Sequence, residues 1–193
     1  MAEPIQIPTA IDSTQEGVLK AATSIRSDAV DVLRLYLAAI TGMEKTLVRK
    51  RWAIKPGIQP PVDTDWASVG ILEVRTDGFP YQQELKTPDV VRATSWQTLH
   101  CMASFYGPHA ETLSDDFREG CQLPQNQRAL KPFGLVIRSC EDSVTHVPDF
   151  SFEQWIDRFD VRFTVGRSVT RDYGVRTLVK AGEIELITER GKA

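Results

Sequence analysis

The chain has 193 residues, of which 41% are hydrophobic and 25% charged, and its formal net charge at pH 7 is -3. This composition is typical of a soluble globular protein with one sizeable core, and the slight acidity excludes a nucleic-acid binder that relies on an overall basic surplus. No apolar run approaches the roughly 20 residues that a membrane helix needs, and the start lacks the basic and apolar regions of a secretory signal, so we expect a protein made and kept in a cytoplasm.

The amino-terminal part predicts an arm followed by a helix. Residues 1–12 contain two prolines and no periodic pattern, which indicates an extended or disordered arm and leaves residues 13–193 as a single domain. Ser13 and Glu16 have capping-box spacing, and apolar residues then recur at helical spacing from Val18 to Ile40. The pattern predicts helix ending near Gly42, either as one long helix or as two, with a restart at Ser24 or Ser27.

The middle of the chain predicts antiparallel β-structure. Residues 46–54 and 68–76 have strand patterns, and between them the run KPGIQPPVDTD at 55–65 must be a loop because it holds three prolines and a glycine. A loop of this length is typical of a functional surface, here one that meets a partner. Asp77-Gly78 indicates a turn, after which residues 81–86 and a strand beginning near Val90 predict a ribbon.

The stretch from Trp96 to Leu130 predicts a strand, a turn and a helix. Between residues 96 and 105 the odd-numbered side chains form the more apolar face of a strand. Gly107 permits a turn and Pro108 favours a first helical position, so residues 109–121 are expected to be a helix. Its apolar residues fall at spacings of three and four and form one buried stripe: Ala110, Leu113, Phe117 and Cys121.

The remaining segments complete the predicted fold class. In chain order they are a short helix or turn at 125–130, a buried strand at 134–140, a helical turn presenting Trp155 at 152–156, a half-buried strand at 159–173 and a final strand at 184–188. This order predicts an α+β fold, with a mainly antiparallel sheet and helices packed on one face.

Catalytic motifs are missing from the sequence. It contains no G-x-S-x-G elbow, phosphate-binding glycine loop or H-E-x-x-H segment, so no catalytic, cofactor-binding or metal-binding residue is expected. One alternative stays open, a hydrolase that uses Cys101 or Cys121 with His100 or His109. The apolar surroundings of both cysteines argue against it, because a reactive thiol needs access and a lowered pKa.

The candidate interface residues are charged or aromatic. Arg49, Lys50 and Arg51 form the only basic run, and strand alternation puts Arg49 and Arg51 on one face and Lys50 on the other. They are candidates for contact with phosphate or with an acidic partner, or they form a solvated strand edge. Trp52 and Trp66 bracket the proline loop and are candidates either for interface hot spots or for core anchors.

A second set of candidates is more widely spread. Glu111, Asp115 and Arg118 lie on the wet side of the helix at 109–121, while Arg162 and Arg171 lie on the late strand. The acidic helix and these arginines are expected either to face each other across a subunit boundary or to be paired or solvated within one subunit.

Five segments together resemble the neck or tail terminator family of tailed bacteriophages. They are LRLYLAAITGM at 33–43, VRKRWAIKPGIQPP at 48–61, DWASVGI at 65–71, SFYGPHAETLSDDFREGCQLPQNQRAL at 104–130 and FDVRFTVGRSVTRDYGV at 159–175. They come in the family's order, with a YGP strand end, a helix, a PQN turn and a late strand with a T-R-x-Y segment. The resemblance covers residues 33–184, and the predicted helix before Leu33 has no counterpart in it.

This resemblance implies a structural virion protein without catalytic residues or cofactors. It implies a homo-oligomeric ring, expected to have six subunits, that caps the tail tube, meets the sheath protein if the tail is contractile, and joins the head-tail connector proteins. Genomic DNA is expected to pass through the lumen without specific binding, and the protein to be assembled in the host cytoplasm and located in the tail or neck of the virion. Two alternatives are a head-tail connector or tail completion protein, with twelve subunits, and the cap of a contractile injection particle.

Overall fold

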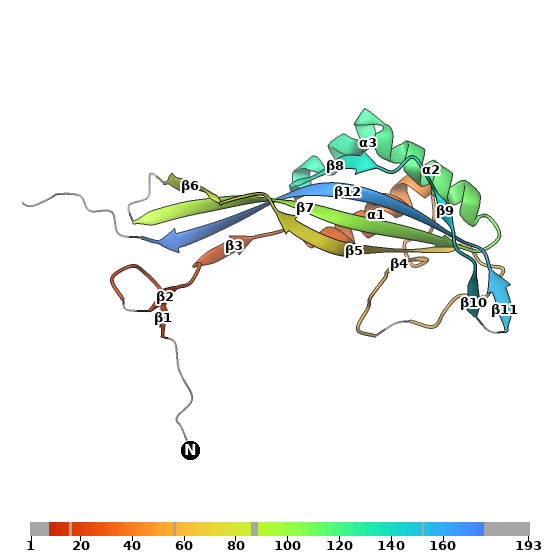
Figure 1. Ribbon diagram of the computed structural model, residues 1–193, viewed down its shortest axis with the longest axis horizontal. Coiled ribbons are helices and arrows are strands. Elements are labelled where there is room, and N and C mark those ends of the chain that lie inside the picture. The colour runs from red at the N-terminus through yellow and green to blue at the C-terminus, as the bar shows by residue number, and fades with distance from the viewer. Residues whose placement is uncertain (1–7, 16, 56, 86–88, 152, 176–193) are drawn as a thin grey trace, which may run out of the picture. The chain divides into compact units, whose positions relative to one another are not determined.

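Three long strands run through the computed structural model, which describes residues 8–15, 17–55, 57–85, 89–151 and 153–175 (Figure 1). These residues divide into two compact units. Unit 1 holds residues 8–24, 81–93 and 171–175, and unit 2 holds residues 25–80 and 94–170. The expected arm at 1–12 and single domain at 13–193 stay predictions, and residues 1–7 lie outside the described part.

The sheet of unit 2 is mainly antiparallel. Its strands lie in the order β12 (Arg158–Gly174), β7 (Val90–Tyr106), β5 (Trp66–Thr76) and β4 (Val48–Lys50). β5 and β7 are antiparallel, with Trp66 opposite Tyr106 and Thr76 opposite Gln97, whereas β4 runs parallel to β5. Two further strands pair antiparallel with β12, namely β8 (Leu135–Cys140) and β9 (Thr145–His146). The predicted α+β class is confirmed.

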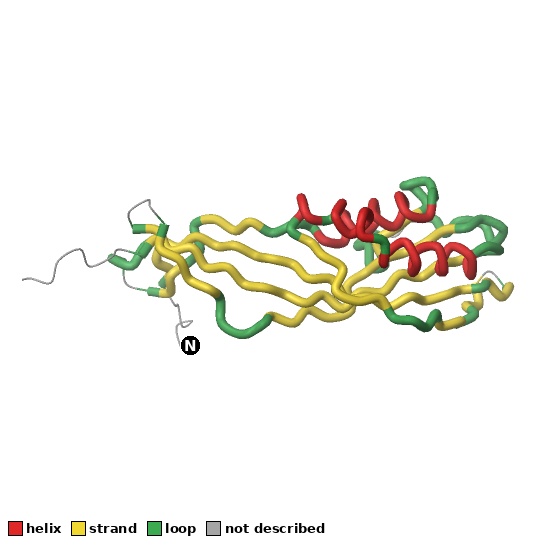
Figure 2. The backbone as a smooth tube through the Cα atoms, turned by 90° about the horizontal axis from the view of Figure 1, so that it is seen from above, coloured by secondary structure: helices red, strands yellow, loops and turns green. Residues whose placement is uncertain are grey.

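The helices of unit 2 share one core with the sheet. They are α1 (Ala29–Thr41), α2 (Ala110–Gln122), α3 (Pro124–Ala129) and the short 3-10 helix η1 (Lys131–Phe133), and Figure 2 shows them grouped beside the strands. Phe117 of α2 lies between Phe105 and Phe163 of the sheet, with ring centroids 5.8 and 5.4 Å away. Odd-numbered residues of β5, β7 and β12 line this core with α1 and α2, as strand alternation requires. Packing of all helices on one face stays a prediction.

The ends of α1 follow from its capping residues. The Asp28 carboxylate accepts a hydrogen bond from the Asp31 N–H at 3.4 Å, and the helix ends as predicted at Gly42, in the left-handed conformation with φ 70°. The helix expected from Val18 onward is wrong, because that stretch holds β2 (Val18–Leu19) and β3 (Thr23–Ile25). Asp28, rather than Ser24 or Ser27, begins the helix.

Tertiary pairing explains the strands found in unit 1. The Ala22 N–H donates to the Asp172 carbonyl at 2.8 Å, and the Ser13 N–H donates to the Gly174 carbonyl at 3.0 Å. β1 (Thr9–Ala10) pairs parallel with β2, and β6 (Tyr81–Glu84) pairs with β7, which confirms the predicted ribbon. Hydrogen bonds to β12 thus outweigh the helical spacing of a short segment whose isolated helix is marginal in water.

The turn before α2 depends on a close approach between Gly107 and Asp65. Gly107 has φ 108°, and a Cβ there would lie 2.7 Å from the Asp65 carboxylate. That carboxylate accepts a hydrogen bond from the His109 N–H at 2.8 Å. α2 begins after His109, so the placement of Pro108 as its first helical residue is wrong. Asp65 thereby fixes the entry to α2 from the end of the proline loop.

Two later segments differ from their predictions, and a third lies outside the described residues. The helical turn expected at 152–156 is wrong, because β10 (Asp149–Ser151) and β11 (Gln154–Ile156) form a hairpin whose turn uses Glu153 with φ 61°. β8 alternates between buried and exposed residues rather than being buried throughout. The strand expected at 184–188 lies outside the described residues. None of the helices in the described part is long and apolar enough to span a membrane.

Candidate assembly interface

β4 places the basic run at the edge of the unit 2 sheet. It is shorter than the strand predicted at 46–54, but the Arg51 N–H continues its pairing by donating to the Val69 carbonyl at 2.9 Å. Val48 is fully buried in the core. Alternation therefore directs Lys50 to the core side of the sheet and directs Arg49 and Arg51 to the opposite face.

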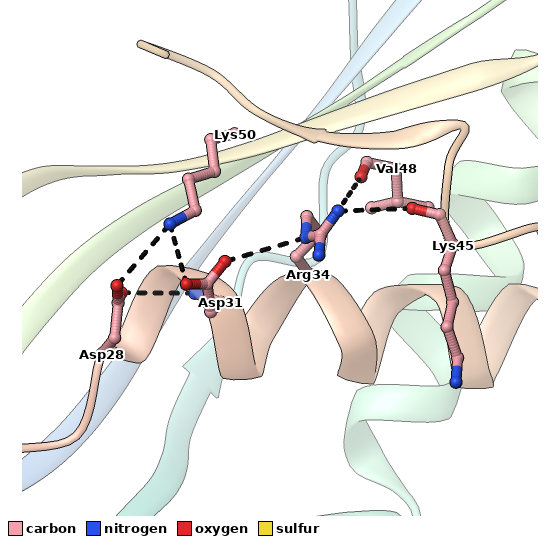
Figure 3. Close-up of polar contacts among 6 residues, drawn as sticks. All are labelled: Asp28, Asp31, Arg34, Lys45, Val48 and Lys50. Carbon is pink, nitrogen blue, oxygen red and sulfur yellow. Dashed lines mark hydrogen bonds and ion pairs between the residues drawn. The ribbon is translucent and has the colours of Figure 1, made fainter. Parts of the chain in front are cut away.

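Lys50 is neutralised by the first turn of α1 (Figure 3). Its ammonium lies 2.8 Å from the Asp31 carboxylate and 3.6 Å from that of Asp28. The hydrogen bond to Asp31 raises the pKa of Lys50. Although burial acts in the opposite direction, the Asp31 N–H and the Lys50 charge lower the pKa of Asp28. Lys50 therefore fastens β4 to the amino-terminal end of α1, where negative charge is favoured.

Arg34 holds the segment between α1 and β4. One guanidinium nitrogen donates to the Val48 carbonyl at 3.3 Å and to the Lys45 carbonyl at 3.4 Å, and its Nε lies 3.9 Å from Asp31 (Figure 3). These contacts satisfy carbonyl groups of the connection, so the path of the chain into β4 is fixed by side chains of α1.

Trp66 and Tyr106 form an aromatic platform on the face that carries Arg49. Their rings stack with centroids 3.9 Å apart and planes 3° from parallel. The Arg49 guanidinium lies 5.7 Å from the Trp66 centroid, and that of Arg158 lies 5.8 Å from the Tyr106 centroid. Each ring thus holds one cation within the range of a cation–π interaction.

A buried polar network anchors the second arginine of the run. Arg51 Nη1 donates to the Ser104 hydroxyl, which donates to Asp160 Oδ1. Arg158 donates to the same carboxylate from Nε at 2.9 Å and from Nη2 at 2.7 Å, and this bidentate pair raises the pKa of Arg158. Ser104 is fully buried and Asp160 is 8% exposed. Because its members are satisfied, the network fixes the Arg51 side chain.

These groups surround an open pocket of about 820 Å³ with a surplus of positive charge. Five basic and two acidic side chains line it, a surplus of three positive charges: Arg34, Arg49, Lys50, Arg51 and Arg158 with Asp31 and Asp149. We call it the basic pocket. Within the described ranges, Arg49 and Arg51 make no ion pair with a carboxylate, whereas Lys50 and Arg158 are each within 3 Å of one.

The proline loop gives the basic pocket an apolar rim. Trp52 is 62% exposed, and Ile54 and Ile58 are almost completely exposed. The Arg49 guanidinium donates to the Ile58 carbonyl at 2.7 Å, and that of Arg51 lies 5.6 Å from the Trp52 centroid. The pocket therefore combines exposed apolar surface with guanidinium groups.

The structure brings together only one of the two predicted sets. Arg49, Lys50, Arg51, Trp52 and Trp66 all line the basic pocket. Trp66 belongs to its platform and Trp52 to its rim. The role of these residues as an interface stays a prediction.

The second set lies elsewhere. Glu111 and Asp115 are exposed on α2, and Arg118 bridges Asp115 at 3.4 Å and Glu119 at 3.6 Å within the same helix. Arg162 is exposed on β12 and lines a different pocket, and Arg171 belongs to unit 1.

Sequence reasoning missed the partners of Arg51. Ser104, Tyr106 and Asp160 contribute to the platform and the network, and none of them is singled out as a site residue in the sequence analysis. The available signal was parity: these residues are even-numbered on strands whose odd-numbered residues are apolar. Parity identifies a shared face, but it cannot tell which strands are neighbours.

The cysteines do not provide a reactive thiol at the positions considered for catalysis. Burial raises the pKa of Cys101 to about 12. Cys121 is also buried, and its hydrogen bond with Cys140 raises its pKa further. His109 Nδ1 lies 2.8 Å from Asp65, in the turn that begins α2. These surroundings oppose thiolate formation at Cys101 and Cys121.

The chain matches a known protein family over most of its length. Residues 27–190 match the family model described as phage neck terminator protein. The match covers nearly all of unit 2, including the basic pocket and α2. It confirms the resemblance read from the five sequence segments. No curated protein matches the chain.

Proposed function

Because the chain belongs to the phage neck terminator family, we propose that it forms a ring of six subunits that caps the tail tube and joins it to the head-side connector. The single observation that supports this most is the family match over residues 27–190. Repetition of one heterologous contact closes a ring when the rotation between subunits divides a full turn. A ring stacked on the tube then leaves no free tube end for further growth.

The proposed partners are virion proteins and further copies of this chain. They comprise the tail tube protein, the connector proteins and, in a contractile tail, the sheath protein. The protein acts without catalysis or cofactors, and it resides in the virion after assembly in the host cytoplasm. DNA passes through the lumen without specific binding. A net charge of -3 supports free passage. Basic side chains would neutralise phosphates of the DNA, and each neutralised phosphate adds affinity that slows its passage.

The basic pocket supports an assembly role through its composition. Tryptophan, tyrosine and arginine are the residues most enriched among interface hot spots. Trp52, Trp66, Tyr106 and Arg49 lie together on this surface. A hydrogen-bonded network beneath it holds Arg51 in position, which reduces the entropy lost when a partner binds.

The decisive experiment combines the purified full-length chain with purified tail tubes. Light scattering measures the mass of the chain alone, and electron microscopy with copy counting measures what binds to tube ends. We expect six copies at one end of each tube and no further tube growth. A stable monomer that leaves tube ends bare would overturn the proposal.

The same copy count tests the two alternative assignments. Twelve copies per virion, placed above the terminator layer, would indicate a head-tail connector or completion protein. Six copies on a particle that carries no genome would instead indicate the cap of a contractile injection particle.

A further inference from the structure

We infer that the basic pocket binds the acidic face of α2 from a second copy of this chain. The inference rests on the proposed ring and identifies the contact that builds it. Three observations support it. Two guanidinium groups have no carboxylate partner among the described residues, a row of carboxylates has a matching spacing, and the two surfaces lie on different layers of unit 2.

The pocket contributes two cations that lack an acidic partner. Arg49 donates to the Ile58 carbonyl and Arg51 to the Ser104 hydroxyl, and neither approaches a carboxylate within ion-pair distance among the described residues. They are two residues apart on a strand path, so their Cα atoms are about 6.6 Å apart on one face. Trp66 and Trp52 lie beside them and shield them from solvent on one side.

α2 presents a row of carboxylates with nearly the same repeat. Glu111, Asp115 and Glu119 are exposed and recur every four residues, which on a helix is a repeat of about 6 Å along one face. Asp116 is exposed beside this row. Among the residues that the structure describes, only Arg118 forms ion pairs with this row, and it bridges Asp115 and Glu119. The face therefore carries a surplus of three negative charges, opposite to the surplus in the pocket.

The two surfaces cannot satisfy each other within one subunit. Ala110, Phe117 and Cys121 bury one side of α2 in the core, so the carboxylate row points away from the sheet. Arg49 lies with Ser68 on the sheet face that does not line this core. A pocket on one layer and a helix face on the other make a heterologous contact between copies, the type that generates rings.

The apolar rim extends the contact beyond the charges. Trp52 lines the pocket, and Ile54 and Ile58 are exposed next in the chain to Ala53, Gly57 and Gln59, which line it. Leu123, just past the end of α2, is 55% exposed. Burial of these side chains against a neighbour supplies the apolar area that ion pairs alone do not. The charges then set the register and exclude a neighbour in the wrong orientation.

The test uses charge reversal on each side of the contact. The pocket variant is Arg49→Glu with Arg51→Glu, and the helix variant is Glu111→Lys with Asp115→Lys. A control matched to the pocket variant, Arg128→Glu with Lys131→Glu, makes the same change of charge as that variant at exposed residues outside both surfaces. Circular dichroism checks folding. Because Arg51 contacts a buried network, Arg49→Glu alone replaces the pocket variant if the double variant does not fold.

Each variant is mixed with purified tail tubes, and the copies bound per tube end are counted at low and moderate salt. We expect the pocket and helix variants to assemble at concentrations about tenfold or more above that of the wild-type chain, and the control to behave as wild type. An equimolar mixture of the two variants pairs each reversed helix with a reversed pocket. It should restore alternating rings, which must have an even number of subunits.

The outcomes separate this inference from the proposed function. If wild type caps tubes and both variants do so equally well, the contact is wrong and the ring function stands. If both variants fail and their equimolar mixture does not restore assembly, the occupant is another protein and the inference is overturned. If the pocket variant assembles normally but no longer binds double-stranded DNA that the wild-type chain binds, the occupant is a phosphate backbone and the inference is overturned. A wild-type chain that never binds tubes contradicts the proposed function itself.

Discussion

The Trp66 indole lies flat on the Tyr106 ring, with centroids 3.9 Å apart. The two residues are opposite each other at one end of the pairing between β5 and β7. This stack closes the end of the β5–β7 ladder and forms the floor beneath Arg49. One pair of rings therefore serves both the stability of unit 2 and the shape of the basic pocket.

Replacing Trp66 should reveal both roles. Trp66→Ala is expected to lower the free energy of unfolding by about 2 kcal/mol, because a half-buried indole and its stacking partner lose contact. Trp66→Phe should recover much of that loss, since an aromatic ring is kept. Urea unfolding followed by circular dichroism measures both variants. An alanine variant as stable as wild type would show that the stack contributes nothing to folding.

The contact between Gly120 and Ile40 sets the distance between α2 and α1. A Cβ at position 120 would lie 2.4 Å from Ile40 Cγ2, so Gly120→Ala is expected to destabilise the protein by about 1–3 kcal/mol. Ile40→Ala removes the clashing methyl group. In a double-mutant cycle, the combined variant should therefore be more stable than the sum of the single effects predicts. Strict additivity of the two changes would contradict close helix packing at this point.

The three cysteines should differ in their rates of alkylation. Cys140 is partly exposed, and its hydrogen bond with Cys121 lowers its pKa, whereas burial raises the pKa of Cys101 to about 12. At pH 8 iodoacetamide should label Cys140 first, as measured by peptide mass spectrometry. Cys140→Ser is the control and should leave only slow labelling. Rapid labelling of Cys101 would instead reopen the question of a catalytic thiol.

Asp172 makes the stability of unit 1 depend on pH. Its carboxylate accepts two hydrogen bonds from Arg92, at 2.8 and 2.9 Å, and this lowers its pKa. A lowered pKa in the folded state stabilises the protein above the unfolded pKa of about 3.9, and this contribution is lost as the pH falls through the folded value.

The comparison of wild type with Asp172→Asn tests this effect. Wild type should have the higher thermal midpoint at pH 7, and the difference should shrink as the pH is lowered below about 4. Arg92→Gln should give the same loss at pH 7, because it removes the other partner of the pair. A difference that stays constant down to pH 3 would mean that the ion pair does not form.

Much of the fold was predictable where local signals and tertiary contacts agree. The spacing of Ala110, Phe117 and Cys121 predicted the buried side of α2, and the alternation from Leu99 to Phe105 predicted the core face of β7. Gly42 marked the end of α1, because glycine has no Cβ and adopts the left-handed conformation at a helix end without a steric penalty. In these places one side of the element faces the core shared by the sheet and the helices, so the pattern in the sequence and the packing carry the same information.

The failures lie where a remote strand decides the local conformation. Val18 to Ile25 has helical spacing, but the Ala22 N–H donates to the carbonyl of Asp172, far away in the chain, and β3 pairs with β12, so the region is extended. The hairpin at 149–156 was misread as a helical turn, because Phe150 and Trp155 pair across a turn rather than along a helix. A short segment without its own core lacks the contacts to fix its structure, and its partner strand supplies them.

The sequence by itself determined the family, the α+β class and the face on which Arg49 and Arg51 lie, because the order of segments and strand alternation are local properties. Only the tertiary structure decided that Arg51 meets Ser104 and Asp160, that Trp66 stacks on Tyr106, and that Lys50 is neutralised by α1. Those contacts join residues far apart in the chain, and their geometry depends on strand order and register, which alternation does not encode. The basic pocket is therefore a product of the fold, although each of its charges is visible in the sequence.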